Sequence, residues 1–255
     1  MSSFGTPAIM LRRLDYGDYD LILTLLTLSR GKISVIAKSA KKSTKRFAGI
    51  LELFSVLNVV CRLGRRAKMP VLQEAELKQP FDQIRQDIIK TAYASYWAEL
   101  IADWSEERQQ QRQLFHLLHF LLMQLDSGKI PSEVLSILFQ LHFMTISGHR
   151  PSLGQCSQCQ TPLDKMGEQA VKVDLAKGGV VCQRCYPTGK PPITLTKGTI
   201  KQLLWLEKVN FEKANRIRFS SQAIKESLEF LEAFVPFHLG KAPRSLTFLR
   251  QIRTP

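Results

Sequence analysis

Hydrophobic positions in the first third of the chain form short runs that are separated by turn-forming residues. Runs that are rich in leucine and β-branched residues, and bounded by Asp, Gly, Ser and Pro, are typical of strands. Five such strands are predicted, at residues 8–11, 19–28, 33–37, 51–63 and 71–77. An OB-fold is a five-stranded barrel of this size that binds oligonucleotides. Another small barrel or an SH3-like domain remains open, because periodicity does not separate these folds.

The spacing of hydrophobic residues changes after Pro80 to a helical one. Ile84, Ile88, Ala92 and Leu100 fall at multiples of four residues and predict a helix that ends at Trp104. Gly148 is expected to end a later helix. The tail at residues 240–255 is expected to be partly mobile. Further helices are predicted at residues 114–125, 131–147, 196–206 and 224–234.

This pattern predicts a multidomain β plus α protein. Residues 1–80 are expected to form an N-terminal five-stranded OB-fold barrel that binds nucleic acid. Residues 81–255 are expected to form a C-terminal all-α domain. Residues 152–190, which hold four of the five cysteines, are expected to be a zinc ribbon inserted into it.

Aromatic and histidine residues in the helical part have two interpretations each. At helical spacing in an apolar pattern, the aromatic residues are predicted to be core rather than a base-stacking stripe. His116 and His119 lie three residues apart, but no third ligand is close in sequence, so we expect core or surface histidines rather than a metal site. The four aromatic residues are Tyr93, Tyr96, Trp97 and Trp104.

The chain is strongly basic, with 36 Lys and Arg against 22 Asp and Glu and a net charge of +14. Residues 1–80 hold 14 basic and 6 acidic side chains, and residues 191–255 hold 11 and 5. Nucleic acid, an anionic membrane or acidic protein segments would be attracted to such ends. No amphipathic helix combines a basic face with exposed aromatics, which disfavours a membrane role. We expect a cytoplasmic, nucleoid-associated protein without a signal peptide, whose cysteines are reduced or bound to metal.

Residues 38–46, which we call the basic segment, carry five positive charges. Small and hydroxyl residues separate these charges, so we expect a solvated loop between strands that grips phosphates. An ordinary solvated charge run is the alternative. The predicted DNA-contacting residues are those of the basic segment and of two neighbouring turns: Lys38, Lys41, Lys42, Lys45, Arg46, Arg30, Lys32, Arg65, Arg66 and Lys68.

Two CxxC pairs, Cys156–Cys159 and Cys182–Cys185, are separated by 22 residues. Each pair offers two thiolates from a tight turn, and two pairs make a tetrahedral site for one structural Zn²⁺. A labile disulfide pair, as in a redox sensor, or an iron–sulfur cluster is the alternative. A ribbon that holds zinc would also add phosphate contacts through Lys177, Arg184 and Lys190. Cys61 lies in a predicted strand and is expected to be a buried spectator.

Signatures of catalysis are missing from the sequence. There is no GxxxxGK[ST] loop, no GxSxG elbow and no HExxH motif, and none of the five histidines is followed two residues later by glutamate, as the zinc deaminases require. We therefore expect a protein that binds and remodels rather than an enzyme.

The chain resembles the bacterial RecO family of DNA repair proteins. The resemblance rests on IMLRRLDYGDYD at residues 9–20, TLSRGKI at residues 27–33, residues 37–49 and the two CxxC pairs. The family pattern usually has glycine after the lysine at position 38, where this chain has Ser39.

The resemblance implies an N-terminal OB-fold, a helical C-terminal domain and a zinc site. It implies a recombination mediator that binds single- and double-stranded DNA, anneals complementary strands and, together with RecR, loads RecA onto DNA coated with single-strand-binding protein. The basic C-terminal segment, with Lys241 and Arg244, would suit the acidic tail of single-strand-binding protein. The main rival is an RNA-binding zinc-ribbon factor.

Overall fold

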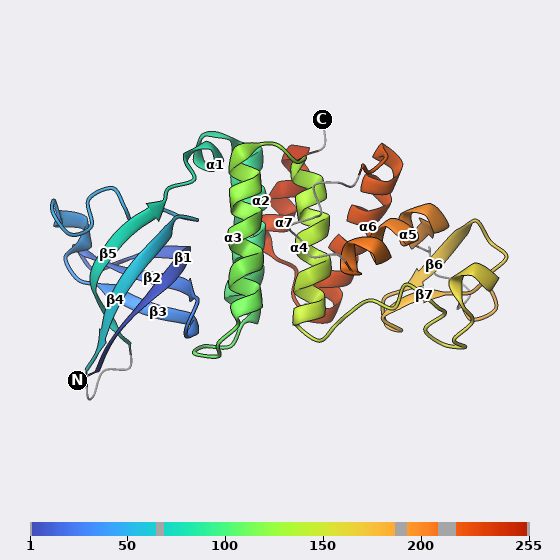
Figure 1. Ribbon diagram of the computed structural model, residues 1–255, viewed down its shortest axis with the longest axis horizontal. Coiled ribbons are helices and arrows are strands. Elements are labelled where there is room, and N and C mark those ends of the chain that lie inside the picture. Colours follow the sequence, from blue (N-terminus) through green and yellow to red (C-terminus); the bar gives the residue numbers. More distant parts are fainter. Residues whose placement is uncertain (1, 65–68, 187–192, 209–217, 254–255) are drawn as a thin grey trace. The chain divides into compact units, whose positions relative to one another are not determined.

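The computed structural model describes residues 2–64, 69–186, 193–208 and 218–253. Two compact units divide the chain, and each is described by itself. The first unit contains residues 1–127 and 243–255, and the second contains residues 128–242. Figure 1 gives the element labels along both units.

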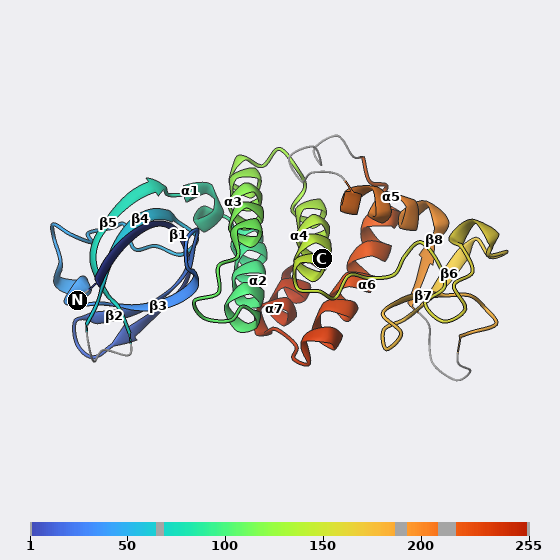
Figure 2. The ribbon, with the colours of Figure 1, turned by 60° about the horizontal axis from the view of Figure 1, so that its bottom comes forward.

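Five antiparallel and parallel strands close into a ring in the N-terminal part of the first unit, as Figure 2 shows. Their order is β1-β2-β3-β5-β4. Side chains alternate in burial along β2 and β3, so that one face of each strand fills the interior, as the period of two requires. The predicted OB-like, five-stranded N-terminal fold is confirmed. The strands are β1 Ser2–Tyr16, β2 Asp20–Thr27, β3 Gly31–Ala37, β4 Val56–Leu63 and β5 Val71–Gln79.

The interior of the ring is apolar. Leu23, Leu25, Val35 and Leu57 are fully buried there. Cys61 is equally buried, and burial raises the pKa of its thiol to about 11, so it is the inert core residue that the sequence predicted. Strand β5 ends at Gln79, directly before Pro80. Gln79 can stay extended before a proline, but Pro80 has no N–H with which to continue the hydrogen bonds between strands.

The edge of β3 is covered by a loop as well as by β5. The pairing of β3 with β5 rests on the parallel partners Ile36 and Val71. Nearer the start of β3, Arg108 donates its backbone N–H to the carbonyl of Lys32 at 2.9 Å. A Cβ atom on Gly31 would lie 1.7 Å from the carbonyl oxygen of Gln109, and Gly31 has φ +64°, so only glycine fits this close approach. The loop thus protects a strand edge that would otherwise be unpaired.

The fourth strand starts later than predicted. Residues 51–55 form a turn instead of the first part of a strand, and β4 begins at Val56. Phe54 has φ +69°, and its N–H donates to the carbonyl of Met10 at 2.9 Å. Leu51 and Phe54 are buried, so the hydrophobic run that suggested a strand is instead the buried side of a turn.

The helix predicted from residue 81 to Trp104 is two helices, α1 Asp82–Gln86 and α2 Ile88–Trp104. Asp87 is extended between them, and its carboxylate accepts hydrogen bonds from the N–H groups of Ile89 and Lys90. The predicted helix at residues 114–125 is confirmed as α3 Arg112–Ser127. Tyr93, Tyr96 and Trp97 are fully buried, which confirms that they are core, whereas Trp104 is only half-buried.

The tail predicted to be partly mobile contains a helix, α7 Arg244–Arg253. Leu246 and Leu249 are buried, and the helix packs on α2. The Glu99 carboxylate of α2 accepts hydrogen bonds from the N–H groups of Arg244 and Ser245, at 3.1 and 2.8 Å. Burial alone would raise the pKa of Glu99, but the bonds from Ser245 and Arg244 outweigh it and hold the pKa below its usual value. A carboxylate therefore caps this helix from a distant segment.

Three predicted helices of the second unit are confirmed: α4 is slightly shorter than predicted, α5 ends later, and α6 is longer at both ends. Gly148, just past α4, has φ +80°, as a helix-terminating glycine requires. The Thr196 hydroxyl accepts a hydrogen bond from the N–H of Thr199 and so caps α5. The helices are α4 Ser132–Ile146, α5 Lys197–Lys208 and α6 Ser221–Leu239. Among the described residues, we find no helix with the length and hydrophobicity that crossing a bilayer requires.

Candidate nucleic-acid interface and metal centre

The basic segment follows β3 and is folded against the ring rather than free in solvent. Residues Ala40–Lys42 form a short 3-10 helix. The Ser43 hydroxyl accepts hydrogen bonds from the N–H groups of Arg46 and Phe47, which closes the following turn. Ala40 and Phe47 are buried in the core of the ring, so the expectation of a wholly solvated loop is wrong. Phe47 anchors one end of the segment, and β3 fixes the other.

The backbone conformation at Ser39 explains why the family pattern usually has glycine at this position. Its backbone has φ +54° and ψ +28°, in the left-handed region, where glycine carries no steric cost. In this chain the Asp20 carboxylate accepts a hydrogen bond from the Ser39 N–H at 2.7 Å. The substitution therefore keeps the turn.

Acidic side chains of the β1–β2 turn lie beside the basic segment. We call residues 15–20 the hairpin turn. The Lys41 ammonium pairs with the Asp15 carboxylate at 2.9 Å, and the Lys41 N–H donates to the carbonyl of Tyr19 at 3.0 Å. These interactions join the two segments into one surface and use part of the positive charge internally. Sequence reasoning missed the acidic partners, although the Asp-Tyr-Gly-Asp-Tyr-Asp string carried the signal.

The remaining cations of the basic segment differ in their partners. Lys38 and Lys45 are exposed, and no ion pair to either is found among the described residues. The Lys42 ammonium lies 3.3 Å from the centroid of the Tyr19 ring. The Arg46 guanidinium donates to the carbonyl of Lys38 at 3.1 Å. Lys38 and Lys45 thus have the charges most available to an external phosphate.

Two predicted DNA-contacting residues outside the segment have structural partners. The Lys32 ammonium is half-buried and donates to the carbonyl of Ala102, near the end of α2, at 2.7 Å. A cation at a helix C-terminus is stabilising, and this hydrogen bond fastens β3 to α2. The Arg30 guanidinium lies 4.1 Å from the centroid of the Phe4 ring. Three further predictions, Arg65, Arg66 and Lys68, lie outside the described residues.

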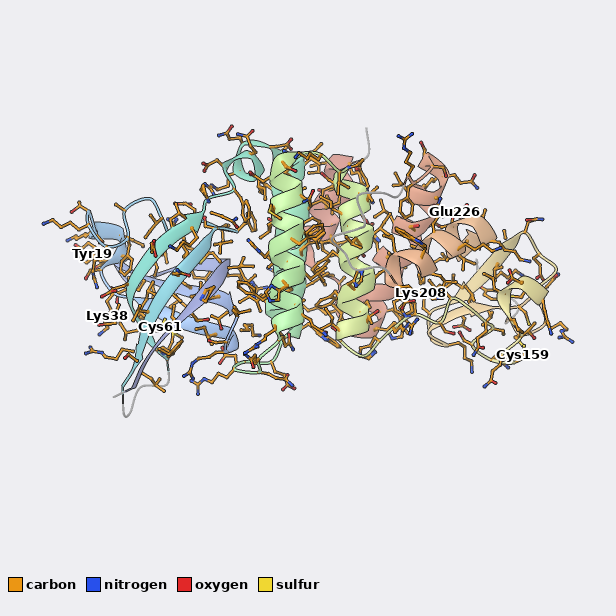
Figure 3. The ribbon with its side chains drawn as sticks, in the orientation of Figure 1. Tyr19, Lys38, Cys61, Cys159, Lys208 and Glu226 are labelled. Carbon is orange, nitrogen blue, oxygen red and sulfur yellow. The ribbon has the colours of Figure 1, made fainter. Side chains whose placement is uncertain are left out.

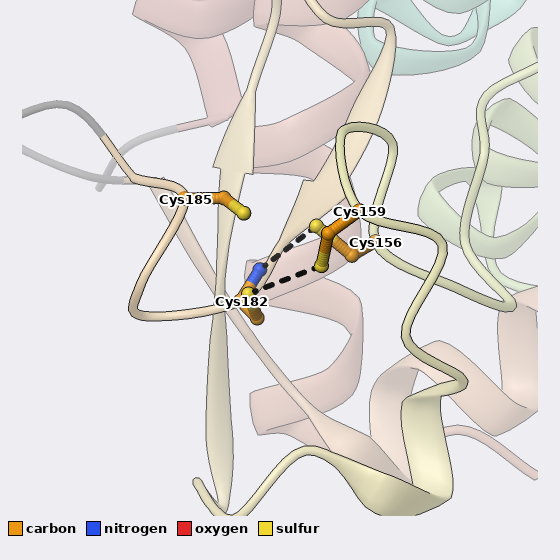
Figure 4. A group of neighbouring side chains, drawn as sticks. All are labelled: Cys156, Cys159, Cys182 and Cys185. Carbon is orange, nitrogen blue, oxygen red and sulfur yellow. Dashed lines mark hydrogen bonds between the residues drawn. The ribbon is translucent and has the colours of Figure 1, made fainter.

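The four predicted metal ligands come together. The sulfur atoms of Cys156, Cys159, Cys182 and Cys185 all lie within 4.8 Å of one another. Figure 4 shows the four side chains gathered at one place in the ribbon. Those of Cys159 and Cys182 are 3.6 Å apart. Four sulfurs at about 2.3 Å from one tetrahedral ion would be about 3.8 Å apart, so the set fits a metal ion of this kind. We call these residues the cysteine cluster.

The local fold explains why the two pairs converge. A three-stranded sheet of order β7-β6-β8 forms the ribbon, and the sequence pattern did not predict these strands, although Val171 and Val173 alternate with polar residues. Its buried strand β7 runs directly into Cys182. The Ser157 N–H donates to the carbonyl of Val180 at 2.9 Å, which brings the first pair beside the second. The strands are β6 Ala170–Asp174, β7 Gly179–Val181 and β8 Ile193–Thr196.

A close backbone approach supports this arrangement. Gly179 pairs with Ser152, and a Cβ atom on Gly179 would lie 2.1 Å from the Ser152 carbonyl oxygen. The Gln160 N–H donates to the carbonyl of Cys156, and the Cys185 N–H donates to that of Cys182. Each CxxC pair is therefore a tight turn, and the glycine lets the two turns meet.

Hydrogen bonds favour thiolate at the exposed member of the cluster. The Thr161 hydroxyl lies 3.1 Å from the Cys159 sulfur, and bonds from Thr161 lower the pKa of Cys159 to about 6. The Cys182 N–H donates to the sulfur of Cys156 at 3.4 Å. Thiolate is the form that binds metal. Cys156 and Cys182 are buried and Cys159 is exposed, so the cluster lies at the surface of the ribbon.

Comparisons with known proteins show the family to which the chain belongs. Residues 1–81 match a family model described as "Recombination protein O N terminal", and residues 85–247 match "Recombination protein O C terminal". A "DNA repair protein RecO" of Desulfosudis oleivorans is 46% identical over 99% of this chain and 99% of its own length. A protein of the same name from Desulfatibacillum aliphaticivorans is 43% identical over 99% of this chain and 98% of its own length. The chain therefore belongs to the RecO family of DNA repair and recombination proteins.

Proposed function

We propose that this protein is a recombination mediator that binds single- and double-stranded DNA and anneals complementary strands. The observation that carries the proposal is the basic segment, held on an OB-like ring of strands by Phe47 in a member of the RecO family. Annealing requires screening of the phosphate repulsion between two strands, and a chain with a net charge of +14 supplies that screening. The mediator acts by binding, without nucleotide and without making bonds.

The cysteine cluster is proposed to hold one Zn²⁺ in a structural role. Four thiolates fill a tetrahedral coordination sphere and leave no position for a substrate or water. The ion would join the turn before β6 to the turn after β7. The ribbon would then present Lys177 and Arg184, both exposed, as additional phosphate-binding residues. Lys190, the third such residue proposed for the ribbon, lies outside the described residues.

The proposed partners are RecR, the acidic tail of single-strand-binding protein and, indirectly, RecA. Lys241 and Arg244 are exposed just before and at the start of α7, where they suit an acidic tail. Reversal of both to glutamate should weaken tail binding, and an unchanged affinity would remove them as candidates. With these partners the protein would act in the cytoplasm, at the nucleoid.

Annealing in the presence of single-strand-binding protein tests the mediator role. The rate at which two complementary strands, coated with that protein, form a duplex is measured with and without this protein and without nucleotide. Strong acceleration is expected. No acceleration despite tight DNA binding would reduce the protein to a binding module. The alternative, an RNA-binding zinc-ribbon factor, would bind RNA more tightly than DNA of the same sequence.

A further inference from the structure

Two tyrosines on the hairpin turn are exposed beside the basic segment. Tyr16, the last residue of β1, has 53% of its surface exposed, and Tyr19, in the turn itself, has 45%. Large apolar side chains that are exposed singly need no explanation. Two aromatic rings three residues apart, next to a run of cations, form a combination typical of surfaces that bind single-stranded nucleic acid.

Hydrogen bonds join the hairpin turn to the basic segment. The carbonyl of Tyr19 accepts the N–H of Lys41, and the Asp20 carboxylate accepts the N–H of Ser39. The Lys42 ammonium lies against the Tyr19 ring. Figure 3 shows Tyr19 and Lys38 at the same end of the ring of strands. Tyr19 is therefore part of one surface with the basic segment, Tyr16 lies on the same hairpin turn, and that surface is assembled before any ligand arrives.

We propose that Tyr16 and Tyr19 form a stacking platform for the unpaired bases of single-stranded DNA. The proposal rests on the proposed function and names the part of the surface that distinguishes single strands from duplex. Every base has an aromatic face, so stacking on tyrosine does not depend on sequence. In a duplex those faces are already stacked on neighbouring bases and are closed to the tyrosines.

The charges around the rings favour a surface on which cations contact phosphates and tyrosines contact bases. The hairpin turn carries Asp15, Asp18 and Asp20, and the basic segment carries five cations. Asp15 is paired with Lys41, so the charge near the rings is only moderately positive. Lys38 and Lys45 remain to contact phosphates, while the tyrosines contact bases. Electrostatic attraction then serves both kinds of DNA, and the rings add affinity for single strands alone.

Affinity for an oligothymidine of about 30 nucleotides and for a duplex of about 30 base pairs is measured at several salt concentrations, since these lengths exceed the binding site of a single OB-like domain. In the double variant Tyr16→Ala, Tyr19→Ala, binding to the single strand is expected to weaken at least about fivefold. Binding to duplex should change less than about twofold, and the slope of log affinity against log salt should stay the same, because the substitutions remove no charge. The double variant Tyr16→Phe, Tyr19→Phe keeps both rings and should retain binding.

Phe237→Ala is the matched control, since Phe237 is 51% exposed on α6 in the other unit and should leave both affinities unchanged. Thermal unfolding of each variant shows whether it is folded. Quenching of 2-aminopurine in the oligonucleotide by the wild type, and its absence in the alanine variant, reports stacking directly. Equal weakening on single strand and duplex, or no weakening on either, would overturn the platform alone. A wild-type chain that binds no DNA would overturn the proposed function as well.

Discussion

The cysteine cluster and the basic segment are built in opposite ways. The four thiols come from two turns 26 residues apart and converge on one point. The basic segment is continuous in sequence, yet its cations have different surroundings: Lys41 pairs with Asp15, Lys42 lies on Tyr19, and Lys45 is exposed. A spacing motif such as the two CxxC pairs predicts a site because all of its side chains would bind one ion together. A run of charges does not predict which of its cations bind a ligand, because each cation has different neighbours in the folded chain.

The largest expected effect is at the cysteine cluster. Cys156→Ser removes a buried ligand, so bound zinc should fall from one ion per chain to none, and the ribbon should lose its fixed fold. Metal analysis and hydrogen exchange of residues 152–186 measure both results. Cys61→Ala, which removes a thiol elsewhere, should keep the full zinc content. Full zinc in the Cys156 variant would show that the cluster is not the metal site.

A smaller but still large effect is expected at Phe47. Phe47→Ala removes the anchor of the basic segment while keeping every charge, and it should destabilise the ring by about 3–5 kcal/mol. Denaturant unfolding measures this destabilisation. DNA affinity, measured where the variant is still folded, should also fall because the cations are no longer held together. Unchanged affinity in the folded variant would mean that charge alone is sufficient.

The salt dependence of DNA binding separates external from internal cations. Replacing Lys41, Lys42, Lys45 and Arg46 by alanine should lower the slope of log affinity against log salt by about 0.9 for each phosphate of duplex DNA that the variant no longer neutralises. Lys32→Ala should leave the slope unchanged and reduce stability by about 1 kcal/mol, because its ammonium is bound to the Ala102 carbonyl. An unchanged slope in the fourfold variant would refute the role of the basic segment.

The smallest effect is expected at Glu99, which caps α7. Glu99→Gln should weaken docking of α7 by about 1 kcal/mol, seen as faster hydrogen exchange in α7. Because the folded pKa of Glu99 lies below its usual value, its contribution is complete above about pH 4.3 and is lost as pH falls through the lowered pKa. Glu229→Gln, an exposed change on α6, is the control. Equal exchange in both variants would show that Glu99 does not hold α7.

Elements with strong periodicity were predictable, and their boundaries were less so. The leucine-rich composition of residues 19–28 predicted β2, and the helical spacing after Pro80 predicted the helical region but not its division into α1 and α2 at Asp87. The hydrophobic run at residues 51–55 was wrongly predicted to be the start of a strand, since a buried turn and the start of a strand have the same hydrophobic composition. The C-terminal helix was missed because its cap, Glu99, lies 145 residues away from Arg244.

The sequence by itself determined which four cysteines come together and the positive charge of the chain. Cysteine spacing and net charge are local or additive properties, so no fold is needed to recognise them. Only the tertiary structure decided which cations are available to a phosphate, that Asp15 and Asp20 lie against the basic segment, and that Tyr19 lies beside it. Those facts depend on pairing between residues that are distant along the chain, and each pairing is selected by the packing of the whole ring rather than by any one stretch.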